Sequence, residues 1–116
     1  MGRMSRQKGK RGEREAAAEL GSLLGCDARR GVQFQGGPDS PDVVLEGVNI
    51  HVEAKRVEAL NLYAAIDQAK SDAGRKVPIV WHRRNGKRSL VIVATEDLVA
   101  LANEIAAAKA HSSMES

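Results

Sequence analysis

The segment from Val48 to Lys55 constrains the fold more than any other part of this chain. Val48, Ile50, Val52 and Ala54 alternate with polar residues, and a period of two predicts a strand with one apolar face. The opposite face of that strand carries Asn49, His51, Glu53 and Lys55. Charged side chains on a strand that should help to fill a core need a reason.

A second strand is expected just before this one, over residues 42–45, with a turn at Glu46 and Gly47. The two strands would form a tight hairpin. Asp42, at the start of the first strand, would then return beside Glu53 on the second. The sequence therefore predicts two carboxylates at one end of a sheet.

Patterns on both sides of this hairpin complete an expected α/β fold. The order is helix, three strands, helix, two strands, helix, which predicts a mixed five-stranded sheet flanked by helices. The helix after the third strand allows a parallel neighbour, but periodicity leaves the pairing of strands open. The other elements expected are a helix from Lys10 to Leu24 ended by Gly25, a strand at Val32 and Phe34, a loop over 35–40, a helix over 62–73, strands over 77–82 and 89–95 joined at Asn85-Gly86, and a helix from Leu98 to about Ile105 capped by Thr95.

The length of 116 residues predicts a single domain with one modest core. We expect a flexible basic arm over 1–9, a domain over 10–110 and a disordered tail over 111–116. Cys26 is the one cysteine, so the chain has no internal disulfide and no cysteine-based zinc cage, and we expect Cys26 to serve packing. No apolar run approaches the roughly 18 residues of a membrane span, so we expect a cytoplasmic protein that does not act at a membrane.

Basic residues are concentrated in two segments. Residues 1–14 hold six Lys or Arg and residues 75–88 hold another six, which together make 12 of the 18 in the chain. Such clusters suit a polyanion, because each neutralised phosphate releases counterions and adds affinity. The alternative is a solubilising tail and a charged hairpin tip. The residues predicted to bind DNA are Arg3, Arg6, Lys8, Lys10, Arg11, Arg14, Arg29 and Arg30.

The paired carboxylates suggest metal chemistry. Mg²⁺ accepts carboxylate and carbonyl oxygens, and Asp42 and Glu53 on adjacent strands can meet at one cation. Lys55 shares the face of Glu53 and would orient an attacking water and offset charge on a reacting phosphate. The alternative is that Glu53 and Lys55 are exposed cross-strand neighbours without a function.

Pro41-Asp42 followed after ten residues by Glu53-Ala54-Lys55 resembles the PD-(D/E)xK motif of the restriction-endonuclease-like nucleases. Gly9, three residues, then Glu13-Arg14 is similar to the start of the first helix in archaeal-type Holliday-junction resolvases and their phage relatives. The resemblance spans about residues 8 to 70 and implies a restriction-endonuclease-like core.

The resemblance also implies roles for particular residues. Asp42 and Glu53 would be metal ligands, with the Ala54 carbonyl as a third and Glu13 as an acid reaching the site from the first helix. Lys55 would be the catalytic lysine. Two further residues match positions near the reacting phosphate in the family, namely Ser40 and Gln68.

The expected function is therefore a Mg²⁺-dependent DNA endonuclease, a homodimeric Holliday-junction resolvase in which Mn²⁺ can replace Mg²⁺ and no small-molecule cofactor is used. A related nuclease acting on flaps, mismatches or duplex, and a non-catalytic DNA-binding protein, are the alternatives. His51 is expected to face a wet groove, and His82 to be structural or to contact DNA.

Overall fold

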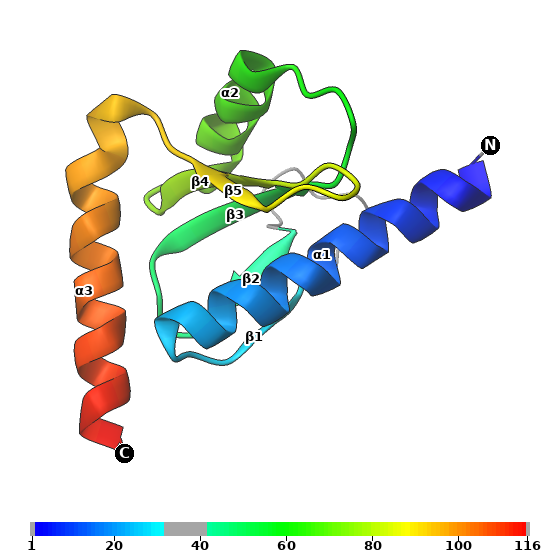
Figure 1. Ribbon diagram of the computed structural model, residues 1–116. Helices are drawn as coiled ribbons and strands as arrows, with labels where there is room; N and C mark the ends of the chain where they lie inside the picture. Colours follow the sequence, from blue (N-terminus) through cyan, green and yellow to red (C-terminus); the bar gives the residue numbers. More distant parts are fainter. Residues whose placement is uncertain (1, 32–41, 116) are drawn as a thin grey trace.

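The computed structural model describes the backbone of residues 2–31 and 42–115 and the side chains of residues 10–31 and 42–114. Within these residues, five strands form one mixed sheet in the order β1-β2-β3-β4-β5 (Figure 1). The elements along the chain are α1 (Gly2–Leu24), β1 (Ala28–Arg30), β2 (Val43–Leu45), β3 (Ile50–Lys55), α2 (Leu62–Ala73), β4 (Val77–His82), β5 (Leu90–Ile92), a 3₁₀ turn η1 (Thr95–Asp97) and α3 (Leu98–Glu115). The predicted α/β class and element order are confirmed.

The pairing of the strands, which periodicity left open, is sequential. β1, β2 and β3 are antiparallel neighbours, β3 and β4 are parallel, and β5 returns antiparallel to β4. Helix α2 makes the crossover that a parallel pair requires. The register pairs Lys55 with His82, so β3 and β4 end side by side.

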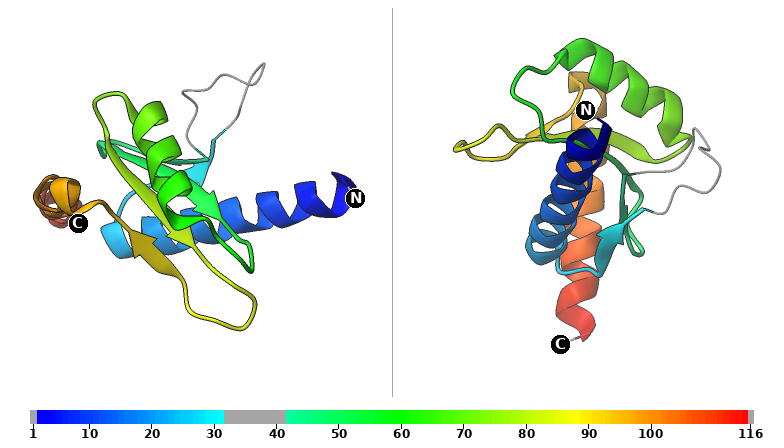
Figure 2. Two further views of the ribbon diagram at one scale, coloured as in Figure 1. Left: turned by 90° about the horizontal axis from the view of Figure 1, so that it is seen from above. Right: turned by 90° about the vertical axis from the view of Figure 1, so that its right-hand side faces the viewer.

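Helices cover the two faces of the sheet, α1 on one and α2 on the other (Figure 2). The larger core lies between α1 and the sheet, where Leu20 packs with Val43, Val52 and Trp81. A smaller core joins α2 to the sheet through Ala65, Ala69 and Val80. The alternation in β3 explains this division, because Ile50 and Val52 face α1 while His51 and Glu53 face α2.

Several predicted boundaries were wrong. Helix α1 begins at Gly2 rather than Lys10, so the backbone of residues 2–9, within the expected flexible basic arm, is helical. Extending an existing helix costs little per residue, and Arg, Met, Gln and Lys are good helix formers. At the other end α3 reaches Glu115, into the expected tail, because Ala108 packs on the core and Lys109 donates to the Leu23 carbonyl.

The first strand also differs from the prediction. β1 spans Ala28–Arg30 and pairs with β2. Its three residues, Ala-Arg-Arg, show no alternation of apolar and polar residues, so the pattern does not reveal this strand. The strand expected at Val32 and Phe34 and the loop over 35–40 lie outside the described residues. Thr95 does not cap α3, because it starts the 3₁₀ turn η1, and the Asp97 amide donates to the Ala94 carbonyl there.

Candidate active site

Asp42 and Glu53 lie side by side where β2 begins and β3 ends. The Asp42 amide donates to the Val52 carbonyl at 3.1 Å, and the register pairs Val43 with Val52. The Ala54 amide donates to Asp42 Oδ2 at 2.9 Å, which fixes the carboxylate against β3. The hairpin predicted from the sequence therefore brings the two acids together.

The two carboxylates strongly affect each other's ionisation. Burial, and after it the negative charge of Glu53, raise the pKa of Asp42 to about 7, and Glu13 adds to this from α1. Burial also acts to raise the pKa of Glu53, but hydrogen bonds with His51 and Asp42 and the charge of Lys55 outweigh it and hold that pKa below its ordinary value. The pair therefore retains a proton near neutral pH, mainly on Asp42. A cation between the two oxygens would displace that proton.

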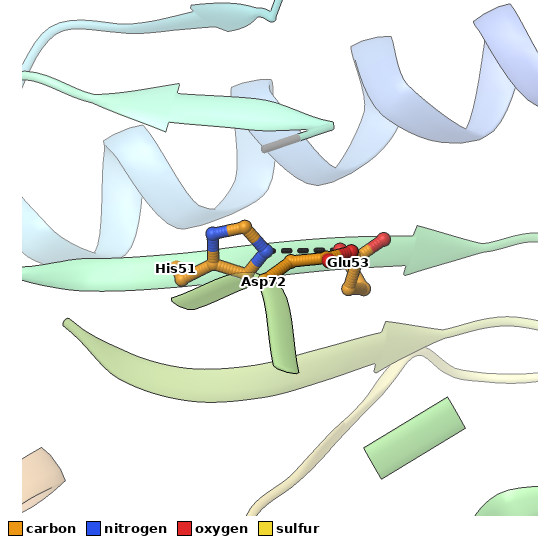
Figure 3. Close-up of side chains that lie close together, drawn as sticks. All are labelled: His51, Glu53 and Asp72. Atoms are coloured by element: carbon orange, nitrogen blue, oxygen red, sulfur yellow. Dashed lines mark hydrogen bonds and ion pairs between the residues drawn. The ribbon is translucent and has the colours of Figure 1, made fainter. Parts of the chain in front are cut away.

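His51 lies in the interior, not in a wet groove as expected. Its side chain is 2 % exposed, and its Nε2 is 2.9 Å from Glu53 Oε1. Asp72 of α2 approaches the same pair, as Figure 3 shows. The prediction for His51 was wrong because periodicity gives the face of a strand and not the helix that covers it.

Lys55 and Glu13 each affect the ionisation of one member of the pair. Lys55 is half-buried, and its positive charge lowers the pKa of Glu53. Glu13 accepts a hydrogen bond from Arg30 Nε at 2.7 Å. Its negative charge also acts to raise the pKa of Asp42. Glu13 is thus paired with an arginine that was expected to bind DNA.

The remaining residues of the predicted site are less closely tied to it. Gln68 is exposed on α2, one turn before Asp72. Ser40 and Pro41 lie outside the described residues. Asp72, which the sequence analysis missed, could have been found from helical spacing, because it falls on the face of Ala65 and Ala69 that meets the sheet.

The predicted DNA-binding residues are in different situations. Lys10 and Arg14 are exposed on α1, and the side chains of Arg3, Arg6 and Lys8 lie outside the described set. The other three are paired with carboxylates: Arg11 with Glu15, Arg29 with Glu46 and Arg30 with Glu13.

Sequence reasoning also missed a charged network beside the site. Arg56 is 7 % exposed, and its guanidinium donates to Glu15 at 2.9 Å and to Asn85 at 2.6 Å. Glu15 also accepts from Arg83 Nη1 at 2.8 Å. The network joins α1, the end of β3 and the β4–β5 turn. Its two arginines, Arg56 and Arg83, come directly after the paired residues Lys55 and His82.

The basic residues of 75–88 are divided by β4. Arg75 and Lys76 precede this strand, whereas Arg83 to Arg88 follow it, about 20 Å away at 3.3 Å per residue. The second group lies at the same end of the sheet as Lys55. There, a hollow of about 330 Å³ is lined by His82, Arg84, Lys87, Arg88 and Leu90.

Cys26 follows the C-terminal end of α1. It lines a hollow of about 830 Å³ between that end of α1 and α3. Burial, with the nearby Asp27 charge, raises the pKa of its thiol. A raised pKa disfavours the thiolate. Cys26 packs against the larger core, as expected.

Comparisons of the chain with models of protein families, with curated proteins and with solved structures found no match. Among the helices described, none combines the length and apolar character needed to cross a membrane.

Proposed function

We propose that the protein is a Mg²⁺-dependent, structure-selective DNA endonuclease, and specifically a Holliday-junction resolvase with a restriction-endonuclease-like core. The observation that carries the proposal is the contact between Asp42 and Glu53, two carboxylates that hold a proton near neutral pH where β2 begins and β3 ends. The motif that suggested this function thus has its two acids next to each other, with Lys55 on the same strand face as Glu53.

The donor set suits Mg²⁺, and Mn²⁺ should replace it. Asp42 and Glu53 would hold the ion, and a divalent charge would remove the repulsion that raises the pKa of Asp42. The Ala54 amide points at Asp42, and the amide and carbonyl of one strand residue point to the same side, which favours the Ala54 carbonyl as a third ligand. Bound there, Mg²⁺ would supply an activated water and neutralise charge on the phosphate.

The other side chains would prepare the site for a phosphodiester. Lys55 would orient the attacking water and offset negative charge that develops on the phosphate. Glu13 would assist from α1, and Ser40 and Gln68 would contribute near the scissile bond.

DNA would be held by its backbone and recognised by shape. Exposed Lys10 and Arg14 would contribute from α1, which the contacts of Glu15 with Arg56 and Arg83 join to the basic β4–β5 turn. Such side chains contact phosphates and carry no base sequence. A homodimer would present two sites to the two opposed strands of a four-way junction.

The test is a cleavage assay on a labelled four-way junction beside linear duplex, flap and single strand, with Mg²⁺ or EDTA. Wild type should make paired symmetric nicks in the junction with Mg²⁺ alone. Asp42→Ala and Glu53→Ala should lose cleavage by a factor of about 10³ or more and still bind the junction. Asp67→Asn, which removes an exposed carboxylate of α2, is the matched control and should cleave like wild type.

Other results would select the alternatives. Cleavage of flaps or duplex in place of the junction would keep the nuclease and reject the resolvase. Tight, salt-sensitive binding without any metal-dependent cleavage would instead favour a non-catalytic DNA-binding protein.

A further inference from the structure

His51, Glu53 and Asp72 form a compact group on the side of β3 that faces α2 (Figure 3). One potential ligand atom from each of the three side chains lies within 4.8 Å of the other two. His51 Nε2 and Glu53 Oε1 are 2.9 Å apart. Asp42 is not a member of this group. Glu53 is the one residue that belongs both to this group and to the Asp42–Glu53 pair.

The fold brings these residues together for a simple reason. Ala69 and Ala73 are buried on the face of α2 that meets the sheet, and their small size lets the helix lie close to β3. Asp72, between them in sequence, is half-buried and reaches His51 and Glu53 with a short side chain. The strand side of the group is closed, since His51 is 2 % and Glu53 4 % exposed. Asp72 is the partly exposed member of the three.

The donor types suit a transition metal better than Mg²⁺. One imidazole nitrogen with two carboxylates is a typical ligand set for Zn²⁺, whereas Mg²⁺ takes oxygen ligands and keeps several waters. Bonds of about 2.1 Å in a tetrahedral zinc site separate ligand atoms by about 3.4 Å. That spacing is wider than the 2.9 Å between His51 and Glu53 and narrower than the 4.8 Å limit within which all three ligand atoms lie, so small side-chain adjustments would satisfy it. Three protein ligands leave the fourth position open, which suits an exchangeable ion.

We propose that His51, Glu53 and Asp72 form a second cation site, selective for Zn²⁺ over Mg²⁺, next to the proposed Mg²⁺ site. Because Glu53 belongs to both, Zn²⁺ bound at this site withdraws Glu53 from Mg²⁺ and inhibits cleavage. The inhibition rests on the proposed nuclease function, but the binding of Zn²⁺ does not.

Binding is measured directly by titrating Co²⁺, whose visible absorption reports nitrogen and oxygen ligation, and then displacing it with Zn²⁺. All proteins carry Cys26→Ser, which removes the thiol as a competing ligand, and none carries a histidine tag. The expected result is one bound ion per chain. Asp72→Asn should weaken binding at least about ten-fold, since even residues behind the ligands cost that much when changed. Asp67→Asn, on the same helix, should bind like the parent protein.

Two comparisons separate this site from the proposed Mg²⁺ site. Asp42→Asn should keep its affinity for Co²⁺, and Asp72→Asn should cleave with Mg²⁺ as the parent protein does but lose sensitivity to Zn²⁺. The site is disproved if Asp72→Asn binds Co²⁺ as tightly as the parent protein, or if binding is lost in Asp42→Asn. If no variant cleaves DNA while the Co²⁺ results hold, the nuclease proposal fails and the metal site stands.

Discussion

Asp42 keeps a proton in the folded protein to a much higher pH than an unfolded chain allows. Its ordinary pKa is 3.8, and burial with the Glu53 charge raises it to about 7. Between these values the folded state binds a proton that the unfolded state has released, so the free energy of unfolding falls as the pH rises. The contribution of Asp42 to stability is therefore complete below pH 3.8 and is lost as the pH passes about 7.

Asp42→Asn is expected to remove this pH dependence. Asparagine can still accept the hydrogen bond from the Ala54 amide but carries no charge beside Glu53. In EDTA, the variant should gain stability relative to wild type as the pH rises from 3.8 to about 7. The measurement is urea denaturation at several pH values. Mg²⁺ should stabilise wild type at high pH and have little effect on the variant.

The control for this experiment is Asp67→Asn, which removes an exposed carboxylate. A stability difference between Asp42→Asn and wild type that does not change with pH would mean that the two acids do not repel each other in the folded chain.

The sequence predicted these residues unequally. The turn between Leu45 and Val48 is short, so the strands on both sides of it must be neighbours. Local patterns reveal both the turn and the strands, and they therefore predict that Asp42 and Glu53 meet. Asp72 comes to the same place from a helix 19 positions beyond Glu53, as 72 minus 53 gives. Helical spacing places Asp72 on the face of α2 that meets the sheet, but its approach to Glu53 depends on the pairing of β3 with β4, which no local pattern reports.

Helix α1 is joined to the sheet by close packing and by charge at the same point. A Cβ on Gly12 would come within 2.8 Å of Arg56 Cβ, so the glycine permits a close approach. One turn further, Glu15 accepts hydrogen bonds from Arg56 and Arg83. Burial acts to raise the pKa of Glu15, but these two arginines outweigh it and lower the pKa.

Glu15→Gln should destabilise the protein by about 1–3 kcal/mol, because a buried guanidinium loses its anionic partner. The lowered pKa means that the stabilisation is present above pH 4.5 and is lost as the pH falls below it. The difference between variant and wild type should therefore shrink in acid, as measured by thermal unfolding. Arg14→Ala on the exposed face of α1 is the control. Equal losses in the two variants would show that Arg56 does not depend on Glu15.

At the level of elements, periodicity located α2, β3 and β4 well and located ends poorly. β3 and α2 have apolar residues at regular spacing because a core covers one side of each. The first turns of α1 and the end of α3 have no such pattern, so their extent depends on helix propagation and on contacts such as that of Lys109 with Leu23.

Across the whole molecule, strand β4 separates the basic residues of 75–88 into two groups, one at each end of the strand. Arg75 and Lys76 lie before β4, and Arg84, Lys87 and Arg88 lie after it, beside the end of β3 that carries Lys55. If DNA binds over the candidate active site, only the second group contacts its phosphates.

Replacing Arg84, Lys87 and Arg88 together with Gln should weaken junction binding and its salt dependence. The slope of log affinity against log salt should decrease by about 0.9 for each phosphate of the duplex arms that the variant no longer neutralises. Binding is measured by fluorescence anisotropy over a range of salt concentrations. The matched control replaces Arg75 and Lys76 with Gln and should leave the slope nearly unchanged.

Equal effects of the two sets would indicate binding by overall charge rather than at one end of the sheet. Arg83 is left intact in both sets because it pairs with Glu15, and its loss would mix folding with binding.

The sequence by itself determined the α/β class, the order of the elements and the meeting of Asp42 with Glu53. These follow from hydrophobic period and turn length, which act between residues close in the chain. Only the tertiary structure decided that His51 is buried, that Asp72 lies beside it and that the basic residues of 75–88 lie at opposite ends of β4. Those facts depend on which strands pair and which helix covers which face, and such choices are made by contacts between segments distant in sequence.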